Sequence, residues 1–273
     1  MVSTRQREID EIVERKGIAA HVMPLHMYAE NLGQADYRRD SHGGAISPWL
    51  AYALLTVIGK IDSGYFDILF DYGSGDRLGV LLTGWIFAWN RVVRMVGIEK
   101  DGGRRDNGGR LLTDLNERAG ASHVLPSIEF DLHPVNFLKE DESLQVPQGR
   151  RAIVFVNNFD DCMLDIRGTL EEALSRNLTE GSVVICFSRL FRPYDGRWTE
   201  EKFLATITAD GLSWSSGGEE DEKKIKVFKY TRSELPAREG TVLTVTGRRE
   251  GRTCHTNETE EVNLLRYKHM FQI

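Results

Sequence analysis

Short apolar runs alternate with helical patterns between residues 66 and 188, and this alternation constrains the fold more than any other feature of the chain. The runs are FDILFDY (66–72), RMVGIE (94–99), SIEFD (127–131), AIVFVNNF (152–159) and SVVICFS (182–188). Their lengths are typical of strands buried on both faces. The helical patterns between them are LGVLLTGWIFAWNRVVR, GGRLLTDLNERAG and LDIRGTLEEALSRNL. The alternation predicts an α/β fold with a parallel sheet covered by helices on both faces.

The two ends of the chain have other patterns. Residues 4–16 carry a helical stripe, and a second predicted helix begins near Ser47-Pro48, with proline in its first turn, and runs through WLAYALLTVIG. Beyond Arg192 we predict strands in FLATITADGLSWSS, KIKVFKYT and TVLTVTG and expect them to be antiparallel. The expected organisation is a small N-terminal lobe of helices and loops (1–62) and one catalytic domain (63–273).

Composition excludes several function classes. A net charge of −6 over 273 residues argues against a general polyanion binder. No apolar run approaches the ~18–20 residues of a membrane span, and the charged N-terminus lacks the apolar centre of a secretory signal, so we expect an intracellular protein. The three cysteines form no CxxC pair and the seven histidines no HxH or HExxH motif, so we expect no metal site. Cys162 and Cys186 lie in or beside apolar runs and are expected to be buried thiols.

The loop DYGSG (71–75) ends the first predicted strand, at the edge where open parallel sheets bind their ligands. It does not complete the dinucleotide fingerprint GxGxxG, because Leu78 stands at the last position and Gly79 comes one residue late. Asp71 would repel a pyrophosphate and attract an ammonium group. Glu99, at the end of the next strand, can accept both hydroxyls of a ribose. Together these acids favour S-adenosylmethionine; the alternative is a tight turn in an NAD-binding or other α/β protein.

A third polar feature is VFVNNFDD (154–161), which ends the fourth predicted strand and faces the same crevice. Asn157 can accept a hydrogen bond from a substrate amine. Phe159 can form the wall of a channel and favour a passing cation. The alternative is an asparagine turn followed by a core phenylalanine.

The segments FDYGSG, VGIEK, VNFL, IVFVNNF and LSW resemble the disruptor-of-telomeric-silencing family, the histone H3 lysine methyltransferases that lack a SET domain. The resemblance covers roughly residues 40–232, is strongest at FVNNF, and suggests a compact member of the kinetoplastid kind. It implies the class I S-adenosylmethionine-dependent methyltransferase fold, with a mostly parallel sheet of seven strands. It also implies a nucleosome substrate, a nuclear location and no contact with a membrane.

The resemblance implies a role for each residue that matches a motif of the family. The glycine loop would hold the methionine end of S-adenosylmethionine, Glu99 the ribose, and Asn136 with Phe137 the adenine. Asn157 would line the place of methyl transfer, and Phe159 and Trp214 the channel for the lysine. The implied cofactor-binding residues are Asp71, Gly73, Ser74, Gly75, Glu99, Asn136, Phe137 and Asn157, and the implied catalytic residues are Asn157, Phe159 and Trp214.

The chain departs from the family pattern at several points. Arg77 stands where the family loop has glycine, His42-Gly43-Gly44 matches the family's tyrosine-glycine-glutamate loop only loosely, and either Phe228 or Tyr230 takes the place of a channel tyrosine. Nucleosomal DNA would be contacted through local basic patches, at Arg104-Arg105, Arg150-Arg151 and within 223–252.

Two other hypotheses remain. NNF can also be a variant of the Asn-Pro-Pro-aromatic motif, which would make the chain a class I methyltransferase of RNA, DNA or a small amine. Arg77 in the glycine loop instead suggests a non-enzymatic scaffold that kept the fold and lost the methyl donor.

Overall fold

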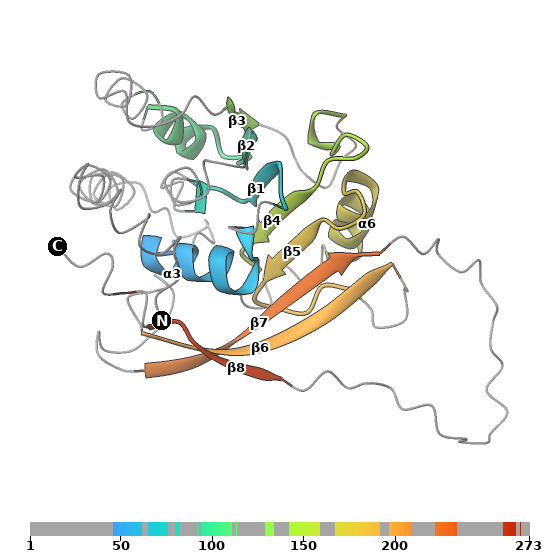
Figure 1. Cartoon of the computed structure of the whole chain (residues 1–273). Coiled ribbons are helices and arrows are strands. Elements are labelled where there is room, and N and C mark those ends of the chain that lie inside the picture. Colours follow the sequence, from blue (N-terminus) through green and yellow to red (C-terminus); the bar gives the residue numbers. More distant parts are fainter. Residues whose placement is uncertain are drawn as a thin grey trace, which may run out of the picture.

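A single sheet of eight strands forms the centre of the computed structural model (Figure 1). The structure describes residues 46–61, 65–75, 80–81, 84, 92, 94–110, 113, 129–133, 142–158, 167–191, 197–208, 222–233, 259–265 and 268. The strands are β1 (Ile68–Tyr72), β2 (Arg94–Ile98), β3 (Glu129–His133), β4 (Ala152–Val156), β5 (Val183–Cys186), β6 (Trp198–Thr208), β7 (Glu222–Arg232) and β8 (Glu260–Asn263).

The strand order is β3-β2-β1-β4-β5-β7-β6-β8. The first five strands of this order pair in parallel, and β7 lies antiparallel between β5 and β6. This order, with β7 reversed, is that of the class I methyltransferase fold, so the predicted fold class is confirmed. Beyond the seven expected strands, β8 adds an eighth at the edge of the sheet, where it pairs in parallel with β6.

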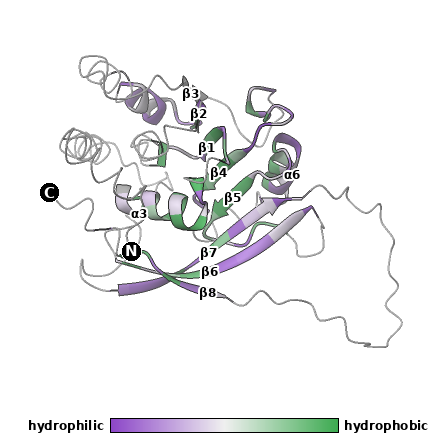
Figure 2. Ribbon diagram, in the orientation of Figure 1, coloured by the Kyte–Doolittle hydropathy of each residue, from purple (hydrophilic) through white to green (hydrophobic). Residues whose placement is uncertain are grey.

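Helices cover both faces of the sheet, as predicted. Helix α3 (Pro48–Ala53) and the π-helix η1 (Leu54–Ile58) pack on one face, and α6 (Arg167–Asn177) packs on the other. Side chains of β1 alternate between these layers, since Leu69 belongs to the α3 side and Phe70 to the α6 side. Figure 2 shows the result: β1, β4 and β5 are predominantly hydrophobic along their length.

The predicted start of one helix and of one strand was wrong. In the first case a capping residue sets the start, and in the second the strand start contacts a distant helix. The helix predicted from residue 108 begins at residue 102, because Asp101 Oδ1 caps it by accepting the Arg104 N–H at 3.0 Å. Strand β6 begins at Trp198 and not at Phe203, and the Trp198 Nε1–H donates to Ser175 Oγ of α6 at 3.0 Å.

Several predicted elements lie outside the described residues. These are the helix at 4–16, the strand TVLTVTG and most of the predicted lobe 1–62, whose described part, 46–61, packs on the sheet. Among the described helices, none is long and apolar enough to cross a bilayer.

Gly59 allows the end of η1 to approach the sheet closely. Its N–H donates to the Leu54 carbonyl at 2.9 Å, which is the last π-helical bond. A Cβ atom at this position would lie 2.8 Å from the Leu55 carbonyl oxygen and 2.8 Å from Ile185 Cδ1. Both distances are shorter than van der Waals contact, so a larger residue here would push the helix away from β4 and β5.

We therefore predict that Gly59→Ala destabilises the protein by roughly 1–3 kcal/mol, the usual cost of overpacking a core. Urea unfolding followed by circular dichroism measures the change. Gly109→Ala is the matched control, because Gly109 is also helical but a Cβ there would meet nothing within 4 Å. Removing that helical glycine should be neutral or stabilise by up to about 1 kcal/mol. Equal effects of the two substitutions would contradict the close approach at Gly59.

Candidate functional site

The glycine loop turns sharply from the end of β1 over the end of β2. Gly73 and Gly75 have φ angles of 87° and 63°, in the left-handed region that favours glycine. The N–H groups of Gly73 and Ser74 donate to the Ile98 carbonyl at 2.9 and 3.1 Å. A Cβ atom at either glycine would meet nothing within 4 Å. The two glycines are thus required by backbone conformation, and the space beside them is open to a ligand.

Glu99 links this loop to the residues that follow β2. One carboxylate oxygen accepts the Gly75 N–H at 3.1 Å, and the other accepts the Asp101 N–H at 2.9 Å. The residue is buried. Since each carboxylate oxygen has two lone pairs, both oxygens keep a second position for a ligand hydroxyl.

Asp71 is the second buried acid of the site. It is 4% exposed at the end of β1. Burial, and after it the charge of Glu99, raise the pKa of Asp71 to about 8. Asp71 is therefore largely protonated at neutral pH in the protein alone, and a cation placed between the two acids would favour its ionised form.

Ser74 adds an unsatisfied polar atom. Its Oγ is buried and has no hydrogen-bond partner. Buried hydroxyl groups are usually hydrogen-bonded, and leaving one unpaired costs about 1–3 kcal/mol. A polar ligand atom beside the loop would satisfy this hydroxyl.

The two asparagines after β4 have different surroundings. Asn157 is half-buried at the strand end. Asn158 is buried, its Oδ1 accepts the N–H groups of Phe187 and Ser188 at 2.9 Å each, and its Nδ2 donates to the Ser188 carbonyl at 2.9 Å. Asn158 thus ties the end of β4 to the end of β5. The sequence signal for this role is a second asparagine directly after a buried strand. Its hydrogen-bond partners lie 29 and 30 residues further along the chain, so the sequence does not identify them.

The structure brings together five predicted site residues, Asp71, Gly73, Ser74, Gly75 and Glu99, at one edge of the sheet, where Asn157 also lies at the end of the neighbouring strand β4. Their binding of a cofactor stays a prediction. Other residues singled out in the sequence lie outside the described residues: His42, Gly43, Gly44, Arg77, Leu78, Gly79, Asn136, Phe137, Phe159 and Trp214.

The two candidates for a channel aromatic differ in their surroundings. Tyr230 is 1% exposed, packs against Phe191, donates to Glu200 Oε2 at 2.9 Å and accepts the Leu190 N–H at 3.1 Å. Tyr230 is therefore a core residue. Phe228 belongs to the same core cluster, at 9% exposed, and also lines a pocket.

The cysteine prediction can be checked at one position. Cys186 is fully buried as predicted, and burial raises its pKa well above the ordinary value. Cys162 lies outside the described residues. Within the described part of the chain, no group of three His, Cys, Asp or Glu side chains could hold a metal ion.

Comparison with known proteins gives a likeness of fold only. No family model and no curated protein matches the chain. Solved structures that are similar include an O-methyltransferase of tomaymycin synthesis from Streptomyces achromogenes, in complex with S-adenosylmethionine, at 14% identity and a TM-score of 0.43, covering 75% of this chain and 89% of that one. Another is a methyltransferase from Geobacter sulfurreducens, at 14% identity and a TM-score of 0.44, covering 77% of this chain and 90% of that one. A third is a tRNA (m1A58) methyltransferase from Aquifex aeolicus, at 13% identity and a TM-score of 0.40, covering 72% of this chain and 73% of that one.

The raised pKa of Asp71 predicts how one substitution changes stability with pH. In the unfolded chain this carboxyl titrates near 3.8, and in the folded protein near 8. Between these values the folded protein holds the extra proton, so the contribution of Asp71 to stability is present below pH 4 and is lost as pH rises towards 8. Asp71→Asn removes this loss. We expect its Tm relative to the wild type to increase by several degrees from pH 5 to pH 8 and then to level off.

The measurement is thermal unfolding of both proteins at a series of pH values, without added ligand. Asp106→Asn, which removes the charge of an exposed acid, is the control and should show a difference that does not depend on pH over this range. A constant Tm difference for Asp71→Asn between pH 5 and pH 9 would show that Asp71 is ionised throughout.

Asn158 offers a second test of the site's construction. Asn158→Ala removes one buried and two partly buried hydrogen bonds and leaves the N–H groups of Phe187 and Ser188 without their side-chain acceptor, which we expect to cost roughly 2–5 kcal/mol. Asn158→Asp retains both accepted bonds and should lose less. Chemical unfolding ranks the variants, and hydrogen exchange at Phe187 and Ser188 should accelerate most in Asn158→Ala. Unchanged exchange at these two amides would contradict the link between the strand ends.

Proposed function

We propose that the protein is an S-adenosylmethionine-dependent methyltransferase that methylates a nitrogen atom. The observation that carries this proposal is the pair of buried acids, Asp71 and Glu99, on either side of an open, left-handed glycine turn. The turn lies where the sheet order reverses, between β1 and β4, and ligands of open parallel sheets bind at such a point.

The residues present fit S-adenosylmethionine. The Asp71 carboxylate would hold the ammonium group, and Ser74 Oγ, unpaired in the protein, would donate to the carboxylate of the methionine end. Glu99 would accept the ribose hydroxyls with its remaining lone pairs. A pyrophosphate does not fit, because two buried carboxylates would repel it.

The chemistry asks little of the protein beyond positioning. S-Adenosylmethionine supplies a methyl group already activated by its sulfonium charge. Asn157 would accept a hydrogen bond from the acceptor amine and so direct the nitrogen lone pair. Alignment of this kind can contribute on the order of 7–11 kcal/mol. The amine must react in its neutral form, and a site that excludes water and holds a cation lowers the pKa of an amine. No general base is therefore required.

For the acceptor we propose two classes. A nitrogen of RNA, DNA or a small amine requires only the fold and the acid–glycine loop, and it is the better supported class because the described residues contain both. A lysine of histone H3 in the nucleosome is supported by the resemblance at FVNNF, which includes Asn157. A nuclear location and contacts with nucleosomal DNA belong to this second class alone.

Two variants separate cofactor binding from transfer. Asp71→Asn removes the charge that would pair with the ammonium group, and we expect it to weaken S-adenosylmethionine binding at least tenfold, since a hydrogen bond to a charged group contributes about 1.5–3 kcal/mol. Asn157→Ala should leave binding within about threefold of the wild type and reduce turnover by roughly 10²-fold, as misplacement of an acceptor does. Calorimetry measures binding, and transfer of labelled methyl measures turnover.

The transfer assay compares intact nucleosomes, free histones, bulk RNA and small amines side by side. Label on histone H3 that is lost in Asn157→Ala would support the lysine acceptor, and label on RNA or on amines alone would refute it while leaving methyl transfer intact. Failure of the wild-type protein to bind S-adenosylmethionine would refute the proposed function and favour a scaffold.

A further inference from the structure

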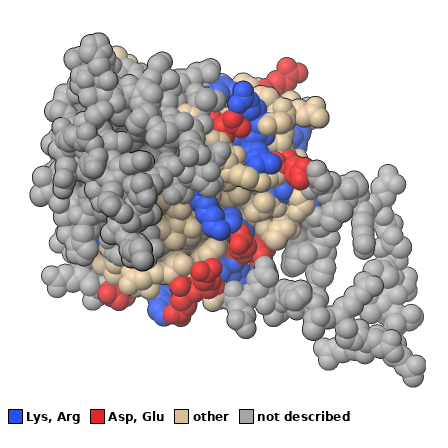
Figure 3. Space-filling view, viewed as in Figure 1, with Lys and Arg blue, Asp and Glu red and all other residues tan. Residues whose placement is uncertain are grey.

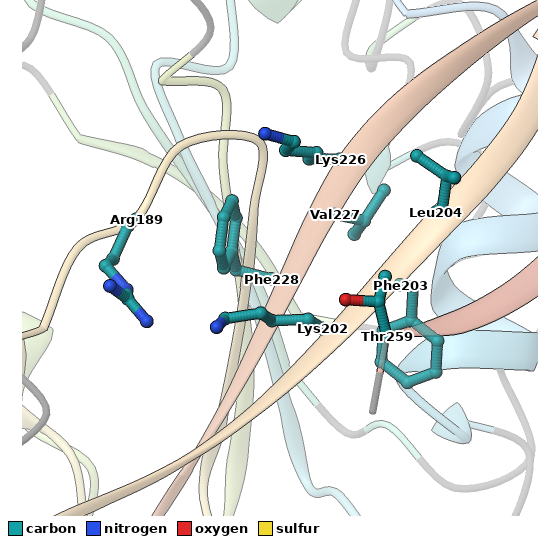
Figure 4. Close-up of a pocket in the computed structure, with 8 residues that line it drawn as sticks. All are labelled: Arg189, Lys202, Phe203, Leu204, Lys226, Val227, Phe228 and Thr259. Carbon is teal, nitrogen blue, oxygen red and sulfur yellow. The ribbon is translucent and has the colours of Figure 1, made fainter. Parts of the chain in front are cut away.

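A pocket of about 540 Å³ lies apart from the glycine loop, on the strands that follow β5 (Figure 4). It is lined by Arg189, Lys202, Phe203, Leu204, Lys226, Val227, Phe228 and Thr259. These residues come from β6, β7, the segment after β5 and the residue before β8. The volume is within the range of about 300–1,000 Å³ that is usual for ligand sites.

The pocket combines an apolar floor with a cationic rim. Aromatic and aliphatic side chains form the floor, and Figure 4 shows the ammonium groups of Lys202 and Lys226 on either side of the Phe228 ring, with Arg189 beside them. Lys202 and Lys226 lie on the same face of the sheet as Phe228, because they occupy paired or alternate positions of β6 and β7. Among the described residues that line the pocket, none is acidic.

Nearby acids do not neutralise this rim. The Glu200 carboxylate accepts two hydrogen bonds from the Arg189 guanidinium, at 2.9 and 2.7 Å, and also lies 3.3 Å from Lys202 Nζ, so one negative charge faces two positive ones. Glu261 pairs with Lys224 at 3.0 Å. Lys226 is exposed and has no hydrogen bond or ion pair within the described part of the chain. The excess positive charge favours a ligand with an anionic group next to an apolar one.

The edge of the sheet beside the pocket favours an extended ligand. Strand β8 pairs with β6 only over Phe203–Thr206. Of the strands in the described part of the chain, none pairs with the outer edge of β6 over Trp198–Lys202. Backbone groups along such an edge can pair with an added strand, while a neighbouring pocket accepts one of its side chains.

We propose that this pocket docks an extended acidic peptide of a partner protein. The peptide backbone pairs with the outer edge of β6, an apolar side chain packs against Phe228, and a neighbouring carboxylate lies near Lys202 and Lys226. A nucleic acid fits less well, because phosphate groups that pair with the lysines would not bury the apolar floor formed by Leu204 and Phe228.

The place of this pocket connects it to the candidate site. Arg189 directly follows Ser188, whose carbonyl accepts the Asn158 side chain, and Asn158 directly follows Asn157. A peptide held at the pocket therefore lies on the side of the sheet where β4 and β5 end. Docking itself requires no methyl transfer, and it is measured without cofactor, so its failure and the failure of the proposed function are distinguishable.

The experiment measures fluorescence anisotropy of a labelled acidic peptide, DDLFED, with the full chain. We expect binding that weakens at least tenfold for NNLFQN, which lacks the charge, and for DDGGED, which lacks the apolar side chains. Lys226→Glu should weaken binding of DDLFED by at least tenfold. Lys223→Glu is the matched control: it makes the same charge change on the same strand, but alternation along β7 places it on the opposite face, so binding should change less than about twofold.

Both substitutions are at strand positions that are not buried, and circular dichroism verifies the fold of each variant. Equal weakening by Lys223→Glu and Lys226→Glu would overturn the pocket as the docking site, since net charge alone would then explain binding. Absence of DDLFED binding would overturn it as well. A single-stranded oligonucleotide that binds in its place, with the same dependence on Lys226, would reassign the pocket to nucleic acid.

Discussion

The Glu99 carboxylate is the contact on which the rest of the candidate site depends. Its two oxygens accept N–H groups from two segments, from Gly75 of the glycine loop and from Asp101 after β2. A buried charge needs such hydrogen bonds to be tolerated. The same charge also contributes to the raised pKa of Asp71. The Glu99 side chain thus fixes the position of the loop, and its negative charge makes the surroundings of the loop attractive to a cation.

Asn158 provides the corresponding link on the other side of the point where the strand order reverses. Glu99 connects the ends of β1 and β2, and Asn158 connects the ends of β4 and β5. Asn157 lies between the two links. Groups that must align donor and acceptor are more effective when the backbone beneath them is held in place. This arrangement suits a site that works by positioning.

The cationic pocket is available because β6 and β7 are longer than the strands beside them. Phe228 is paired with Cys186, the last residue of β5, so β6 and β7 continue beyond the end of β5. The surface in Figure 3 shows basic and acidic side chains intermixed on the described part of this view. On the described part of this face, charge is thus divided into small local patches.

The amino-acid sequence by itself determined the central strands, their parallel pairing and the place of the glycine turn after β1, because apolar periodicity and left-handed glycines are local properties of the chain. Tertiary structure alone decided the place of β7 between β5 and β6, the added strand β8 and the partners of Asn158. It also decided the raised pKa of Asp71, since Glu99 is 28 residues away in the chain and burial depends on the whole sheet. The pocket at Phe228 was also decided by tertiary structure, because the residues that line it come from segments that no local sequence pattern brings together.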